Sequence, residues 1–193
     1  MELRKCLLTR IILCLFMTGF VSARAGGADS VLADDRHGKE VCVKNMYCSV
    51  IPAHWDTERW KGPDFHIRYT DYSNIIEVAR YGPHSLVFKS YTDFIGNLSA
   101  GGAPLQKVGK IIVAGAAAEH WRKHYPLVWS GEELPTRHSE WAYDEYVILR
   151  DEGSFWVFHF QSFSPVYEPE PESRHVWLNF LKQMRFEGQR KAR

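Results

Sequence analysis

The residues whose types and spacing are best suited to chemistry are Glu119, His120 and His124. Two histidines four residues apart on a helix point the same way, and a nearby carboxylate can complete a zinc or copper site. A zinc peptidase needs its glutamate between the histidines, and here the glutamate precedes them. On a strand the histidines share a face but lie roughly 13 Å apart, too far to bind one ion. We therefore expect solvated surface histidines and no metal, and His120 and His124 remain the candidates if a metal binds.

Paired carboxylates are the second pattern that can do chemistry. Asp144-Glu145 and Asp151-Glu152 suggest acid–base catalysis, but neighbouring residues on a strand face opposite sides, and the second pair falls in a turn. We expect both pairs to be surface charges. The sequence has no nucleophile elbow, phosphate-binding glycine loop or dinucleotide fingerprint. It therefore predicts no catalytic residue, no cofactor and no enzyme.

The first 25 residues predict export. Arg4 and Lys5 give a basic start, residues 7–21 are mainly apolar, and Ala23-Arg24-Ala25 is a small-x-small cleavage site. The apolar run is broken by polar residues, whereas a membrane-spanning helix needs about 20 apolar ones. We expect a signal peptide at 1–25, a periplasmic or secreted protein, and no stable membrane span after cleavage.

Composition limits the class of partner. The predicted signal peptide removes four of the 24 Lys and Arg residues and one of the 23 Asp and Glu residues, which leaves a net charge of about −2. A balanced charge gives no reason to expect nucleic acid or an anionic membrane as partner, since both require a clustered positive field. The remaining length fits one domain at 38–187, after a flexible lead-in at 26–37 and before a basic tail at 188–193.

Two cysteines, Cys42 and Cys48, remain after signal cleavage. An even pair in an exported chain predicts a disulfide, and the five residues between them allow two short strands to meet at a turn at Lys44-Asn45. The alternative is a pair of free buried thiols. A loop this small constrains the unfolded chain by only about 2 kcal/mol, so the bridge is expected to fasten one hairpin.

Alternating apolar and polar residues predict a mainly antiparallel sheet. Strands are expected at 40–44, 47–51, 65–69, 75–80, 85–90, 140–149 and 154–162, with another beginning at 110. The segments 75–80 and 85–90 are expected to form a hairpin around Gly82-Pro83, and 140–149 and 154–162 a second one. A short helix is expected at 91–102 and an amphipathic C-terminal helix from Ser173 to Met184. Residues 116–125 fit a helix or a strand. The predicted class is an α+β domain with a sheet covered by helices.

The order of these elements resembles the Mog1/PsbP-like fold, including small exported bacterial proteins of the DcrB type. The resemblance lies in Phe65-His66-Ile67-Arg68-Tyr69, in 109–115 leading into an Ala-rich segment, in the hairpin ending at 155–162, and in the closing helix with 180–186. The usual Tyr-Pro after the first strand is absent, because Tyr69 is followed by Thr70. The resemblance implies an α/β/α sandwich that serves as a binding or assembly domain without catalytic residues of its own.

Seven tryptophans are the strongest positive sign of function. Most are expected in the core, but Trp55, Trp60 and Trp129 lie in loops beside prolines, where they can line a pocket or a partner surface. The alternative is that all three close the ends of the sheet. We expect an exported, non-catalytic binding or assembly module whose partner is an envelope protein or a small ligand. A metal-dependent or hydrolytic envelope enzyme and a structural or stress-related envelope protein are the alternatives.

The signal peptide gives a first testable prediction. The exported protein should begin at Gly26, because the small-x-small site ends at Ala25. Mass spectrometry of the protein purified from the cell envelope measures this directly, and an intact chain starting at Met1 in that fraction would contradict it.

Overall fold

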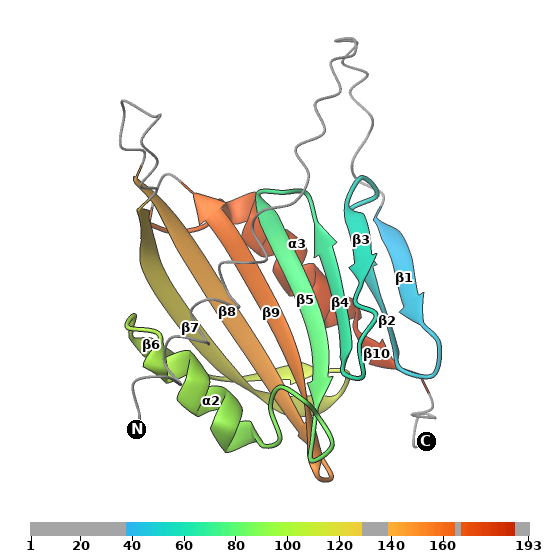
Figure 1. The fold of residues 1–193 in the computed structure, drawn as a ribbon. Coiled ribbons are helices and arrows are strands. Elements are labelled where there is room, and N and C mark those ends of the chain that lie inside the picture. Colours follow the sequence, from blue (N-terminus) through green and yellow to red (C-terminus); the bar gives the residue numbers. More distant parts are fainter. Residues whose placement is uncertain (1–37, 129–138, 165–166, 188–193) are drawn as a thin grey trace, which may run out of the picture. The chain divides into compact units, whose positions relative to one another are not determined.

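The computed structural model of the chain describes residues 38–128, 139–164 and 167–187. Its strands form two sheets in which every ladder is antiparallel (Figure 1). The larger sheet consists, in spatial order, of β3 (Asp56–Arg59), β4 (Phe65–Thr70), β5 (Asn74–Tyr81), β9 (Ser154–Ser164), β8 (Ser139–Asp151), β7 (Ala116–Val128) and β6 (Leu105–Val113). The smaller sheet consists of β1 (Lys39–Val43), β2 (Tyr47–Ile51) and β10 (Arg185–Phe186). The mainly antiparallel α+β class is confirmed.

The predicted signal peptide (1–25), lead-in (26–37) and basic tail (188–193) lie outside the described residues. Within the described part of the chain, neither helix has the length and apolar character needed to cross a membrane.

One face of the large sheet packs against helix α3 (Pro171–Gln183). Trp177, Phe180 and Leu181 are the buried residues of this helix, and their spacing places them on one side of it. Trp177 stacks on Phe160 of β9 with ring centroids 5.6 Å apart. The small sheet contributes Tyr47 to the same core. This helix, with its apolar stripe, confirms the predicted C-terminal helix.

Helix α2 (Tyr91–Ala100) packs on the opposite face of the large sheet. Ser90 caps it, because the Ser90 hydroxyl accepts a hydrogen bond from the amide of Asp93. Phe94 is its buried residue and lies 5.8 Å from Phe155 of β9, centroid to centroid. Since Phe155 and Phe160 differ by an odd number of positions, they point to opposite faces, so β9 is packed on both sides.

The predicted α/β/α sandwich, a sheet covered by helices, is not what the structure shows. The described residues supply one helix to each face of the large sheet, so the fold is mostly β. The reason is that residues 116–125, which fit either a helix or a strand, belong to β7. This strand is hydrogen-bonded to β6 on one side and β8 on the other, and these two ladders outweigh the helix propensity of its alanines.

The hairpin predicted around Gly82-Pro83 is wrong. Strand β5 pairs with β4 on one edge and β9 on the other, so no edge remains for residues 85–90. The Ser85 hydroxyl instead accepts hydrogen bonds from the amides of Val87 and Phe88, and this turns the chain toward α2. The hairpin predicted at 140–149 and 154–162 is present as β8 and β9, with Gly153 at φ +68° in its turn.

Both outer edges of the large sheet are irregular or charged. Edge strand β6 has a register break between Lys107 and Gly109, with Val108 between them. Edge strand β3 has only four residues, and all of them are exposed.

The disulfide between Cys42 and Cys48 is present, as predicted. The two residues lie directly opposite each other in the β1–β2 ladder, so the bond joins neighbouring strands. The turn between the strands contains three residues, and Asn45 takes the left-handed conformation at φ 62°.

The packing alternative for the loop tryptophans holds for Trp55, and the exposure of Trp60 is different. Trp55 is 2% exposed and belongs to the main core, whereas Trp60 is 37% exposed. Replacing Trp55 with Ala should therefore lower the free energy of unfolding by about 3–5 kcal/mol. Trp60→Ala should lower it by about 1 kcal/mol. Urea unfolding of the two variants measures the difference, and equal losses would show that the two rings are packed alike.

Candidate functional site

Of the three tryptophans predicted to line a binding surface, the structure describes Trp55 and Trp60, which differ in exposure. Trp55 lies in the core, which is the packing alternative, and has no exposed ring area for a partner. Trp60 stacks on His66 with ring centroids 4.6 Å apart, and the Arg68 guanidinium lies 4.9 Å from the same ring. Trp129 lies outside the described residues. Of the three, Trp60 alone is seen with exposed area.

His120 and His124 both lie on β7, the arrangement in which two histidines four apart are too far from each other to share an ion. Each has its own carboxylate. The Nε2 atom of His120 lies 2.6 Å from Glu145, and that of His124 lies 4.0 Å from Glu168. Both side chains are only 12% exposed, so the expectation of solvated surface histidines is wrong. Packing against carboxylates on neighbouring segments explains their burial.

Asp144 and Glu145 were expected on the surface, and this is also wrong. Their residues are 3% and 0% exposed. They do face opposite sides, as alternation on a strand requires, but β8 is covered on both faces. Glu145 points under α3, where Tyr143 donates a hydrogen bond to it. Burial raises the pKa of Glu145, but the contacts from His120 and Tyr143 outweigh it and hold this pKa below its ordinary value.

On the other face, three neighbouring strands bring Glu77, His159 and Asp144 together in one row. Glu77 of β5 is directly opposite His159 of β9 in the ladder, and Asp144 of β8 is two residue pairs along from His159, on the same face. The Nδ1 atom of His159 lies 3.1 Å from Glu77, and its Nε2 atom lies 3.2 Å from Asp144. The Tyr146 ring stacks flat on the imidazole, with centroids 4.4 Å apart and planes 5° from parallel.

This geometry fixes the charge of His159. An ionised carboxylate can only accept hydrogen bonds, so an imidazole with a carboxylate at each nitrogen is stabilised as the doubly protonated cation. Burial alone lowers the pKa of His159, but the hydrogen bonds to Asp144 and Glu77 outweigh it and raise this pKa to about 9. Burial raises the pKa of Glu77, and the contacts from His159 and His66 hold it well below its ordinary value. The three residues of the row together carry one net negative charge, which the Arg68 guanidinium beside Glu77 balances.

The row continues through polar contacts on both sides. The Arg68 guanidinium binds Glu77 at 2.9 Å, and the Gln161 amide donates to Asp144 at 2.9 Å and to the Tyr125 hydroxyl at 3.2 Å. Each carboxylate oxygen of Glu77 and the Oδ1 atom of Asp144 already has a donor. His159 has no nitrogen left to accept a proton, so it cannot act as a general base in this state.

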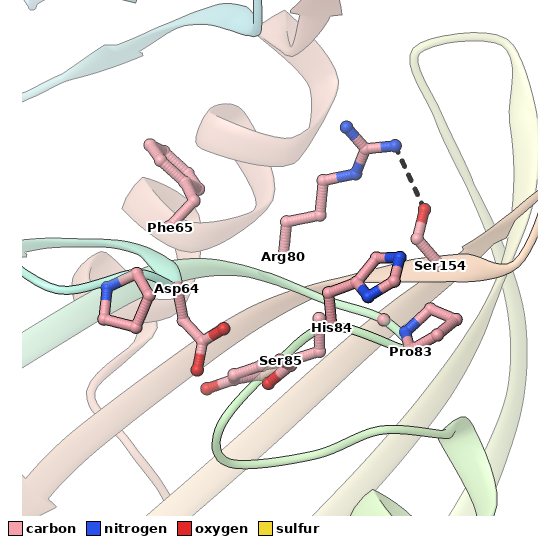
Figure 2. Close-up of a pocket in the computed structure, with 10 residues that line it drawn as sticks. Asp64, Phe65, Arg80, Pro83, His84, Ser85 and Ser154 are labelled. Carbon is pink, nitrogen blue, oxygen red and sulfur yellow. Dashed lines mark hydrogen bonds between the residues drawn. The ribbon is translucent and has the colours of Figure 1, made fainter.

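A pocket of about 290 Å³ lies where β5 ends and β4 and β9 begin (Figure 2). This volume is near the lower end of the range for small-molecule sites, about 300–1,000 Å³. Its lining combines apolar rings with acidic, basic and hydroxyl-bearing side chains. The lining residues are Pro63, Asp64, Phe65, Arg80, Tyr81, Gly82, Pro83, His84, Ser85 and Ser154.

The loop that forms one wall of the pocket is held by local hydrogen bonds. The amide of Ser85 donates to the Gly82 carbonyl at 2.9 Å, which closes a turn with Pro83 at its second position. The Asp64 carboxylate accepts from the amide of Leu86 at 3.2 Å, and so joins this loop to the segment before β4. The wall is therefore ordered before any ligand arrives.

Gly82 permits the close approach of this loop to the β8–β9 turn. A Cβ atom at position 82 would lie 3.2 Å from the Ser154 Cβ and 3.3 Å from the Gly153 carbonyl oxygen, tighter than nearly all real contacts of this kind. Because Gly82 has no side chain, the loop can lie directly against Ser154 at the start of β9.

Arg80 is the cationic group of the pocket. Its guanidinium lies over the Trp156 ring, 5.4 Å from the centroid, and its Nη2 atom donates at 3.0 Å to both Asp151 and Ser154 (Figure 2 shows the bond to Ser154). The side chain is 42% exposed. A guanidinium has five N–H donors, so groups on Nε and Nη1 remain after these two bonds.

One group of potential metal ligands occurs among the described residues. Cys42, Cys48 and Glu187 place their ligand atoms within 4.8 Å of one another. The two sulfur atoms are bonded to each other, so neither is a thiolate, and a metal would require the disulfide to be reduced first. As it stands, the group is a disulfide with a carboxylate beside it.

Sequence reasoning missed Glu77, His159 and the Arg80 pocket. A signal for the first two was present, because polar His159 and Gln161 alternate with phenylalanines in a strand, and Glu77 interrupts an apolar strand. Polar residues within a strand that has two packed faces require partners on the neighbouring strands. The pocket had no such signal, since it depends on a loop that the sequence predicted as a strand.

Comparison with known proteins gives only distant similarities. No family profile matches the chain. No curated protein matches it either. A solved structure from Bacteroides thetaiotaomicron VPI-5482 is similar over 74% of this chain at 10% identity, with a TM-score of 0.41. The chain spans about half the length of that protein, 46%. LpqN, involved in cell envelope biogenesis of Mycobacterium tuberculosis, is similar over 82% of this chain and 98% of its own, at 15% identity and a TM-score of 0.40.

The ion row predicts a pH-dependent stability. The contribution of His159 is fully present below about pH 6.5, its ordinary pKa, declines above it, and is lost once the pH rises past about 9. Glu77 acts in the opposite sense, because its contribution is present above pH 4.5 and is lost as the pH falls below that value. His159→Ala leaves the buried Asp144 and the half-buried Glu77 without the cation between them and should lower the free energy of unfolding by about 3–5 kcal/mol at pH 6.

Urea unfolding at pH 6, 8 and 10 tests this. The wild type should lose stability between pH 6 and 10, and the variant should lack the His159 part of that loss. His175→Ala, which changes an exposed histidine on α3, is the control and should follow the wild type. A His159→Ala variant that matches the control at pH 6 would show that the ion row does not stabilise the fold.

Proposed function

We propose that the protein is an exported, non-catalytic binding module of the cell envelope that holds a small ligand in the Arg80 pocket. The observation that carries this proposal is a contrast between two kinds of polar group. In the ion row both nitrogens of His159 are bonded to carboxylates, whereas Arg80 has hydrogen-bond donors to spare in a preformed hollow. Spare donors on an ordered wall are what binding requires.

The absence of catalysis is part of the proposal. A general base needs a free acceptor atom within reach of substrate, and the most perturbed histidine, His159, has a carboxylate on each nitrogen. The His120–Glu145 pair resembles a base and its orienting carboxylate, but Glu145 is fully buried beneath α3. Both groups are better explained as stabilising the sheet.

The envelope location is supported by two features of the chain. The first 25 residues have the pattern of a signal peptide. The Cys42–Cys48 disulfide fits an oxidising compartment, since such bonds are rare in the cytosol. We also propose a relation to the Mog1/PsbP-like fold. It is supported by the long β8–β9 hairpin and the helix α3 that follows it, which occur in the expected order.

A ligand screen by thermal unfolding tests the function. The purified mature protein is heated with a panel of small metabolites, and a ligand at about 100 times its Kd should raise Tm by about 5–10 °C. Each ligand is then recovered and checked by NMR, and it should be unchanged. Recovery of a reaction product would favour the envelope enzyme, and a panel without any ligand would favour a structural envelope protein.

A further inference from the structure

The small sheet carries three potential metal ligands close together. Cys42 of β1, Cys48 of β2 and Glu187, which directly follows β10, have their sulfur and carboxylate atoms within 4.8 Å of one another. They come from the three neighbouring strands of this sheet (Figure 1). Tyr47 and Ser49, on either side of Cys48, are buried toward the core and α3, so alternation turns Cys48 the other way. The group therefore lies on the face away from α3, where Cys42 and Glu187 are exposed.

Glu187 is held in place by the hairpin that carries the cysteines. Its amide donates to the Met46 carbonyl at 2.9 Å, and its Oε2 atom accepts from the amide of Asn45. Its Oε1 atom lies 3.7 Å from the Cys48 Sγ and has no donor among the described residues. A sulfur atom in a disulfide has no proton to donate, so this oxygen is aimed at an atom that gives it no hydrogen bond. The oxidised protein thus leaves one oxygen of Glu187 available beside the sulfur pair.

The spacing of the three groups fits a zinc ion once the sulfur atoms are thiolates. In a tetrahedral site with Zn–S bonds of about 2.3 Å and Zn–O bonds of about 2.0 Å, a sulfur and an oxygen ligand lie about 3.5 Å apart, and two sulfur ligands about 3.8 Å apart. The 3.7 Å contact between Glu187 and Cys48 is already close to the first spacing. The second requires the sulfur atoms to separate, and the exposed Cys42 side chain can rotate to allow this without a change in the ladder.

The donor set favours zinc over other common ions. Mg²⁺ and Ca²⁺ prefer oxygen ligands throughout, and Cu(I) prefers sulfur. Two thiolates and one carboxylate suit Zn²⁺, and the exposure of Cys42 and Glu187 leaves the fourth position to water. The three ligands carry three negative charges, of which zinc neutralises two. The nearby Arg185–Glu40 pair, 2.5 Å apart, is neutral as a whole, and Lys44 in the hairpin turn adds one exposed positive charge.

We propose that the Cys42–Cys48 disulfide is the oxidised form of a redox-controlled zinc site. Reduction converts the pair into two thiolate ligands, and Glu187 completes the protein part of the site. The site is separate from the Arg80 pocket, whose lining includes none of these three residues, and it does not depend on ligand binding there.

The reductant of this step is a dithiol, either a small molecule or a protein. One of its thiolates attacks the exposed Cys42 sulfur, the disulfide bond breaks, and the Cys48 sulfur leaves with the electron pair and takes up a proton. The second thiol of the reductant then displaces the Cys42 sulfur. Two electrons and two protons have passed to the protein, and the reductant has become a disulfide. Binding of Zn²⁺ then releases the two thiol protons.

Cobalt(II), a spectroscopic substitute for zinc, tests the proposal. The mature protein is reduced with dithiothreitol, separated from it by gel filtration without oxygen, and titrated with Co²⁺. Thiolate ligands on Co²⁺ give a charge-transfer band in the near ultraviolet. The reduced protein should show this band at one equivalent of Co²⁺, and Zn²⁺ should displace the cobalt. The oxidised protein should show no band.

Two variants and a matched control identify the ligands. Cys48→Ser should abolish the two-thiolate band. Glu187→Gln keeps an oxygen for the Asn45 amide but loses the charge, and it should weaken Zn²⁺ binding to the reduced protein at least about tenfold, since losing even a hydrogen-bond partner of a metal ligand typically costs that much. The control is Glu40→Gln. Glu40 is a carboxylate two residues before Cys42 on the same strand face, outside the ligand group, and its replacement should not weaken Zn²⁺ binding.

Circular dichroism shows whether each reduced protein is folded, and four results overturn the proposal. The first is a reduced, folded protein that binds neither ion. The second is an oxidised protein that binds Zn²⁺ as tightly as the reduced one, because zinc then binds elsewhere. The third is a Glu187→Gln variant that binds Zn²⁺ as the control does, because the carboxylate is then not a ligand. The fourth is a chain that unfolds on reduction and stays unfolded with Zn²⁺, since a bound ion should restore the fold.

Discussion

The register of β9 between β5 and β8 is the constraint on which the rest of the structure depends. It places His159 between Glu77 and Asp144 on one face and, at the neighbouring positions, Phe158 and Phe160 in the core on the other. A slip of one residue would exchange the two faces and put the imidazolium among the aromatic rings. The ion row therefore stabilises the fold and also selects the register of β9, because a slipped register would bury the imidazolium without its carboxylates.

The same strand connects the packing of the core to the pocket. Trp156 lies in the main core next to Phe158, and the Arg80 guanidinium lies over its ring. Ser154, two residues earlier, accepts a hydrogen bond from Arg80. The pocket is thus built on the start of a central strand, and a loop supplies only part of its wall. A site supported in this way keeps its geometry without a ligand.

The sequence predicted those parts of the fold that depend on local pattern. The β8–β9 hairpin, α2, α3 and the disulfide partners Cys42 and Cys48 each have a turn, cap or periodic signal of their own. The sequence left β7 undecided, because the ladders on its two edges come from distant segments. It misplaced Asp144 and Glu145 for a related reason. Charged residues are usually exposed, and the burial of these two depends on partners from other strands, among them His159 and His120. The Arg80 pocket joins three segments in space, which no local pattern encodes.

The two outer strands of the large sheet have a consequence for how the protein behaves at high concentration. An exposed strand edge is a template for pairing with another chain, and long, flat, apolar edges lead to aggregation. Here β3 is short and its side chains include Asp56, Glu58 and Arg59, while the register break at Val108 interrupts β6 between Lys107 and Lys110. Each edge thus resists the addition of a further strand. Charge at one edge and an irregular register at the other thus protect a seven-stranded sheet from pairing with a second copy of itself.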